Sequence, residues 1–180
     1  MKNPFSNFST FFLCIIVILL SFTACKKQPP KPVFDLNTPG GEVKAYYYDS
    51  IPKTVYYYKV DEKGNKTQEI IGQADYYDNQ QQYAGGGYKN GKKEGKWYAF
   101  FRDGSVQTEA FYIDGKEHGA YNLYRENGNP VLKAHYNHGN CDGTWYWYNE
   151  KGEVTQKIIA DKNTVACEYC EKCLKLKIKN

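Results

Sequence analysis

Three cysteines near the C-terminus have the spacing of a reactive or metal-binding motif. They form the run Cys167-x-x-Cys170-x-x-Cys173. Thiolates at this spacing could cap a zinc ion or hold part of an iron–sulfur cluster, although the fourth cysteine of the ferredoxin pattern is missing. Outside the cytoplasm disulfides are the expected fate of such cysteines, and Cys141 is then the natural partner for the one left over. Disulfides are the preferred reading, a metal site and free thiols remain alternatives, and we expect no bound cofactor.

The three histidines give little support for catalysis or metal binding. His135, His138 and Cys141 follow one another at a spacing of three, which is compatible with metal ligands. The residues 24 positions earlier are of unrelated types, so we interpret the three as ordinary strand and turn residues, and His118 as a solvated turn residue. The chain shows no catalytic triad, paired carboxylates or phosphate-binding loop. We therefore expect no enzymatic activity.

Residues 1–24 have the features of a signal peptide. The apolar run over residues 11–22 reaches only about half of the ~20 residues that span a bilayer. It ends in Phe22-Thr23-Ala24-Cys25, which resembles a bacterial lipobox, although Phe22 replaces the usual leucine. The resemblance implies cleavage before Cys25 and acylation of this residue, with ordinary secretion as the alternative. We expect a stable lipid anchor that makes the membrane a partner of the protein.

The stretch over residues 25–42 is rich in lysine and proline and predicts a tether. Pro29, Pro30 and Pro32 fix φ and lack N–H donors, so the segment cannot form a helix or a central strand. Lys26 at the second position of the mature chain resembles lipoproteins that are passed on to an outer membrane. We therefore place the protein in the cell envelope, on the outer membrane.

The composition predicts a sheet with half-exposed aromatic residues. Aromatic residues make up 17% of the chain, with 18 tyrosines beside 16 glycines. Such a chain orders itself through amphipathic tyrosines instead of a thick aliphatic core. The net charge of +4 is modest and the lysines are spread along the chain, which does not indicate nucleic-acid binding.

A repeat of 24 residues organises the middle of the chain. The segments 95–104, 119–128 and 143–152 all read Gly-x-aromatic-x-x-aromatic-x-x-x-Gly. Upstream, residues 62–71 match residues 150–159 at seven of ten positions, and Gln80 stands where a turn glycine belongs. We therefore expect the array to begin near Val55 with one degenerate unit.

Each unit predicts two strands and two turns. Polar and apolar residues alternate with a period of two, and Asp103-Gly104 and Asn127-Gly128 are hairpin-turn pairs. Gly91 and Gly95 are expected to provide the positive φ for the turns at the opposite edge of the sheet. The predicted fold is all-β: an elongated antiparallel meander of hairpin repeats over residues 55–163. An N-terminal cap (43–54) precedes it, and a cysteine-rich tail with a cap strand (164–180) follows it.

These units resemble MORN repeats, and the 24-residue spacing resembles the bacterial MORN-repeat variant. The resemblance covers residues 55–163. It implies a hairpin-repeat sheet and, by analogy with eukaryotic members, a scaffolding or membrane-associated module. Bacterial variants are often labelled antitoxins, but an antitoxin must meet its toxin in the cytoplasm and we expect this chain to be exported. We therefore set that label aside.

The leading hypothesis is a membrane-anchored, non-catalytic binding or scaffold module. Alternation along the strands puts four aromatic residues on one face of the sheet, and we expect this face to contact an unknown protein or cell-surface ligand. These candidate contacts are Trp97, Tyr121, Trp145 and Trp147, with the Trp145 and Trp147 pair preferred. The alternative for any one of these rings is that it stacks along the array and stabilises the sheet. The rival hypothesis is a redox or metal-handling envelope protein that uses the C-terminal cysteines.

Overall fold

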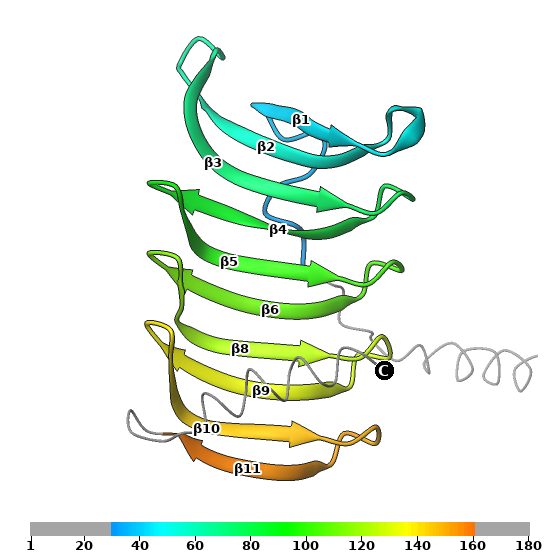
Figure 1. Ribbon diagram of the computed structural model, residues 1–180, viewed down its shortest axis with the longest axis vertical. Helices are drawn as coiled ribbons and strands as arrows, with labels where there is room; N and C mark the ends of the chain where they lie inside the picture. Colours follow the sequence, from blue (N-terminus) through cyan, green and yellow to red (C-terminus); the bar gives the residue numbers. More distant parts are fainter. Residues whose placement is uncertain (1–29, 161–180) are drawn as a thin grey trace, which may run out of the picture.

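The computed structural model describes residues 30–160, which form one open antiparallel sheet of 11 strands (Figure 1). The strands follow one another in chain order, and the two-residue strand β7 pairs beside β6. A single 3-10 turn, Tyr48–Ser50, separates the first two strands, and residues 30–160 contain no α-helix. The predicted all-β meander is therefore confirmed. The strands are β1 Gly41–Tyr46, β2 Pro52–Val60, β3 Lys66–Tyr76, β4 Gln82–Lys89, β5 Lys92–Phe100, β6 Val106–Ile113, β7 Lys116–Glu117, β8 Gly119–Tyr124, β9 Pro130–Asn137, β10 Asn140–Tyr148 and β11 Val154–Ala160.

The two edges of the sheet use different turns. On one edge, three two-residue turns place both of their residues at positive φ, as type I′ hairpins require. They are Asn90-Gly91, Asp114-Gly115 and His138-Gly139. The opposite edge has wider turns, such as the one in which the Phe101 N–H donates to the Ser105 carbonyl at 2.8 Å. Gly104 alone has positive φ there, so the Asp103-Gly104 pair forms a wider turn than the two-residue hairpin that its sequence suggests.

One sequence match is misleading about register. The turn of residues 61–65 closes with an Asp61 N–H to Asn65 carbonyl bond, and residues 149–153 close in the same way. Because a meander alternates between its edges, the first turn lies on the edge of the two-residue turns and the second on the opposite edge (Figure 1). The similarity of residues 62–71 to residues 150–159 therefore reflects shared turn chemistry and not a shared place in the repeat.

The strand register defines two faces, because residues directly opposite each other on paired strands point to the same side. Face A carries, among others, Ala99, Thr108, Leu123, Leu132 and Trp147. Face B carries Val55, Ala74, Gly85, Tyr98, Glu109, Asn122, Lys133, Tyr146 and Lys157.

Two hydrophobic cores lie on opposite faces of this one sheet. The first, in β2 and β3, is on face B and contains Val55, Tyr57, Ala74 and Tyr76. Phe34, in the segment before β1, stacks on Tyr57 at 4.8 Å and lies so close to Gly72 that a Cβ there would be 2.3 Å from its ring. The second, in β9 to β11, is on face A and contains Leu132, Ala134, Cys141, Trp145 and Ala160. Burial therefore changes sides between the two ends of the array.

Candidate binding face

The tryptophans of face A belong to the fold. The Trp97 indole N–H donates to the Gly87 carbonyl at 3.0 Å, and two repeats later Trp145 donates to His135 at 3.1 Å. A Cβ on Gly86 would lie 2.4 Å from the Trp97 ring, so the indole rests directly on the backbone. Each indole thus covers a small residue and caps a carbonyl of the preceding strand.

The expected exposure of this aromatic row is wrong for two of its four members, Trp97 and Trp145. Trp97 is 9% exposed and Trp145 is 1% exposed, so neither ring offers a surface to a partner. Tyr121 and Trp147 are half-buried and pack against the face-A core. The side-chain directions were predicted correctly, but most of this row is packed into the protein.

A lysine is held between two rings at the start of the same row. The Lys93 ammonium lies 4.1 Å from the centroid of the Trp97 indole and 5.0 Å from that of Tyr112. Burial lowers the pKa of Lys93, against the attraction of Glu117. Burial likewise raises the pKa of Tyr112, whose hydroxyl donates to Glu117 at 3.3 Å. Because the amine is desolvated and enclosed between two rings, this cluster leaves little room for a ligand.

The cysteine and histidine expectations can be tested only within residues 30–160. Cys141 is disulfide-bonded and 3% exposed, which agrees with the disulfide reading. Cys25, Cys167, Cys170 and Cys173 lie outside the described residues, as does the expected cap strand. His135 is on face B, where its Nδ1 lies 3.4 Å from Asp142, while Cys141 is on face A. The three residues of the His135, His138 and Cys141 spacing therefore do not converge, and no group of three or more His, Cys, Asp or Glu side chains in the described range is arranged to hold a metal.

The open surface is face B. From β5 to β11, a straight cross-strand row alternates aromatic, acidic, amide and basic groups. Neighbouring strands lie about 4.8 Å apart, so the row extends over roughly 25 Å. Its members are Tyr98, Glu109, Asn122, Lys133, Tyr146 and Lys157, of which none is fully buried.

Glu109 is oriented by two donors and keeps a free oxygen. Its Oε2 accepts from the Tyr124 hydroxyl at 3.0 Å and from the Asn122 amide at 3.3 Å. Its Oε1 accepts no hydrogen bond from the described residues. Burial, followed by this bond to Glu109, raises the pKa of Tyr124 to about 12. The phenol therefore stays protonated and holds the carboxylate in place.

A hollow of about 320 Å³ opens on face B beside this carboxylate. Its principal lining residues are Lys96, Tyr98, Glu109, Phe111, His118 and Asn122, from strands β5, β6 and β8 and the bulge before β8. Lys96 lies opposite Phe111 in the sheet and is exposed, with no ion pair among the described residues. Phe111 is 37% exposed. The hollow thus combines two rings, a free cation and an oriented carboxylate.

His118 departs from the expected solvated turn residue. It is half-buried, its ring centroid lies 4.7 Å from that of His138, and its Nδ1 is buried without a hydrogen-bond partner among the described residues. The residue follows β7 and precedes the positive-φ Gly119, where the strand bulges. Because of this bulge, the His118 side chain lines the wall of the hollow.

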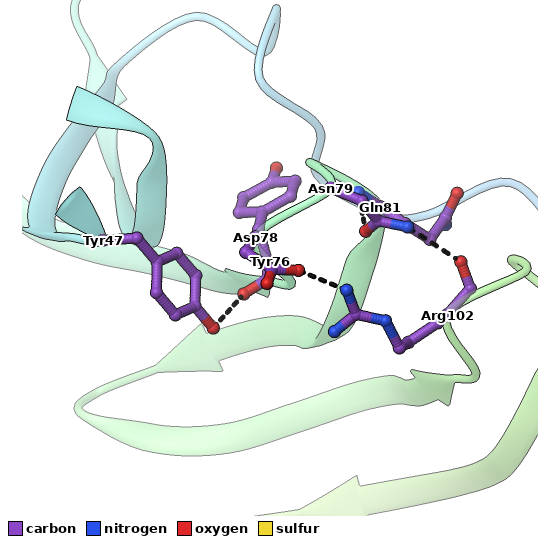
Figure 2. A network of polar contacts seen from close by, with 6 residues as sticks. All are labelled: Tyr47, Tyr76, Asp78, Asn79, Gln81 and Arg102. Carbon is purple, nitrogen blue, oxygen red and sulfur yellow. Dashed lines mark hydrogen bonds and ion pairs between the residues drawn. The ribbon is translucent and has the colours of Figure 1, made fainter. Parts of the chain in front are cut away.

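Figure 2 shows a second polar cluster, at the edge with the wide turns. The Arg102 guanidinium pairs with the Asp78 carboxylate, and the Asn79 amide donates to the Arg102 carbonyl at 3.2 Å. Residues 78 and 102 are 24 apart, so these contacts join corresponding turns of successive units. Tyr47, from the loop before β2, donates to the Tyr76 carbonyl at 3.1 Å and joins the first hairpin to the array. We interpret the cluster as structural, because its members satisfy one another and their backbone.

Comparison with protein-family models and with curated proteins finds no match. Within residues 30–160 there is no helix long and apolar enough to cross a bilayer. The hollow was not predicted from the sequence, because its residues come from three strands that only the bulged register brings together. The only usable signal was that Lys96 and Phe111 occupy the face opposite the tryptophans.

Proposed function

We propose that this protein is a non-catalytic binding module, held at a membrane by a lipid on Cys25, that contacts its partner through face B. The observation that carries the proposal is the asymmetry of the sheet beyond β3. There face A carries the buried rings of Trp97 and Trp145, while face B exposes large apolar residues next to charged ones. These apolar residues are Phe111 and Ile159, which are 37% and 71% exposed.

Exposed apolar side chains that are rimmed by polar groups are typical of interaction surfaces. On face B, Lys133 approaches the Tyr148 ring at 5.7 Å and Lys157 approaches Tyr146 at 5.8 Å. Such pairs arrange rings and cations on a stiff sheet, so a partner meets a preorganised surface and loses less conformational entropy on binding.

Membrane attachment is tested by changing Cys25 to Ser in the full chain. The wild type is expected in the membrane fraction with acyl mass on its N-terminal peptide, and the variant is expected to carry no acyl mass. Equal retention of both in membranes, with no acyl mass on the wild type, would show that the anchor is wrong.

The role of face B is tested with the mature protein immobilised in detergent and challenged with solubilised envelope material. We expect Phe111→Ser to lower the amount of specifically retained material at least tenfold. Tyr48→Ser is the matched control, because Tyr48 is 75% exposed but lies in the loop before β2. Equal retention by both variants, with unchanged circular dichroism, would remove face B from the proposal.

The redox or metal-handling alternative rests on cysteines that are mostly outside the described residues. The buried disulfide at Cys141 favours a structural role, because Cys141 is 3% exposed and its sulfur is poorly accessible to exchange partners. Metal analysis and thiol titration of the purified protein separate the hypotheses. Stoichiometric metal or a reversible dithiol with an accessible potential would support the alternative.

A further inference from the structure

We propose that the hollow on face B binds one unit of an acidic saccharide chain. This inference rests on the proposed use of face B for binding and names the chemistry of the ligand. The hollow's volume of about 320 Å³ is at the lower end of the range of about 300–1,000 Å³ for small-molecule sites. Its lining also has the usual character of such sites: apolar walls with a few convergent polar groups.

The two rings provide stacking surfaces. Tyr98 packs against Phe100 on one side, with centroids 5.9 Å apart and planes 29° apart, and its remaining surface lines the hollow. Phe111 lines the hollow on the neighbouring strand and has no ring partner among the described residues. The face of an aromatic ring is negative, so it attracts the positively polarised C–H groups on one side of a pyranose.

The polar groups match hydroxyls and a carboxylate. The free Oε1 of Glu109 accepts from a sugar hydroxyl, and Asn122 lies beside it as a further hydrogen-bonding group. Lys96 is the unpaired cation at this site, and an acidic sugar supplies its counter-charge through a charge-assisted hydrogen bond.

The surroundings favour a chain over a single sugar. The row on face B continues from Asn122 to Lys133 and Tyr146 on the next two strands, which adds a second cation and another ring. An acidic peptide is less well matched, because peptides that bind sheets usually pair with an edge strand, and the hollow lies inside the sheet.

The test is saturation-transfer NMR of the mature protein in a zwitterionic detergent that contains no sugar. The probes are tetragalacturonate, which is acidic, and maltotetraose, which is neutral. We expect binding of tetragalacturonate, with the neutral chain at least tenfold weaker. Phe111→Ala should abolish binding of both probes. Lys96→Met should weaken only the acidic probe, by roughly tenfold or more, because a hydrogen bond to a charged group contributes about 1.5–3 kcal/mol. Lys151→Met, in the β10–β11 turn, is the control for general charge.

Each outcome decides a separate point. No transfer to either probe would overturn the saccharide site, even if face B retains envelope material. The protein could instead bind phosphatidylglycerol vesicles and no sugar, with vesicle binding weakened by Lys96→Met. This result would also overturn the saccharide site and would assign the face to lipid headgroups. A third outcome is that Phe111→Ala abolishes tetragalacturonate binding while Phe111→Ser retains as much envelope material as the wild type. This result would support the saccharide site and contradict the wider binding role of face B.

Discussion

The ammonium group of Lys93 lies 4.1 Å from the centre of the Trp97 indole ring. This cation is half-buried between strands, and burial lowers its pKa from the ordinary value of 10.5. The folded protein therefore binds this proton less tightly than the unfolded chain does. At neutral pH the charged lysine opposes folding through desolvation, while its contact with the ring partly offsets this cost.

The first prediction concerns the pH dependence of this site. As pH rises through the lowered pKa of Lys93 towards 10.5, the folded state releases its proton first, and the lysine's contribution to stability increases. The free energy of unfolding of the wild type should therefore rise relative to Lys93→Met over that window. Urea unfolding of both proteins at neutral pH and near pH 10.5 measures the difference. A fall in the unfolding free energy of the wild type relative to Lys93→Met between neutral pH and pH 10.5 would contradict the burial of Lys93.

The second prediction separates two neighbouring tryptophans. Trp145→Ala should cost about 3–5 kcal/mol, because it empties a fully buried site and removes the hydrogen bond to His135. Trp147→Ala should cost clearly less, because Trp147 is half-buried and its indole donates no hydrogen bond to another of residues 30–160. Chemical denaturation of the two variants gives both values. Equal losses of unfolding free energy in the two variants would show that Trp145 is not more deeply buried than Trp147.

The third prediction concerns backbone strain in a turn. Gln80 has a φ of 65° at the place where later units have glycine. Gln80→Gly should stabilise the protein by about 1 kcal/mol, because a side chain is unfavourable in this conformation. The matched change in the next unit, Gly104→Ala, should have the opposite sign, since its φ is 85° and the new Cβ meets Gln81 at 3.2 Å. Thermal melts of both variants check the pair.

The fourth prediction concerns the disulfide of Cys141. Peptide mapping without reductant should link Cys141 to one of Cys167, Cys170 and Cys173, as the sequence suggests. Reduction should then lower the free energy of unfolding by about 2–5 kcal/mol. Alkylation of Cys141 in the denatured, unreduced protein would contradict the bond.

The fold was largely predictable, because strand alternation and turn glycines are local properties of the chain. The 24-residue spacing correctly predicted which side chains share a face, as with Trp145 and Trp147. It could not predict which face is buried, since alternation separates the two sides without showing what packs on either one. For this reason Trp97 and Trp145, which looked like part of an exposed binding surface, proved to be buried.

The candidate site was harder to predict, because it depends on register between strands. Lys96 lies opposite Phe111 in the pairing of β5 with β6, and His118 joins them where the chain bulges before Gly119, which takes a φ of 74°. The histidine beside them looked like a turn residue for the same reason. Local sequence shows that a glycine is present, but not how far the bulge shifts the pairing of the neighbouring strands.

The placement of the two cores on opposite faces has a consequence for cooperativity. Strands β4 to β6 lie between the cores, and their buried residues Trp97, Phe100 and Ala110 belong to neither. In a linear array each strand contacts only its neighbours, so the ends can hold their structure while the middle opens. Amide hydrogen exchange should therefore be slowest in β2–β3 and β9–β10 and faster between them. This array would open at its centre, next to the hollow, before its two ends come apart.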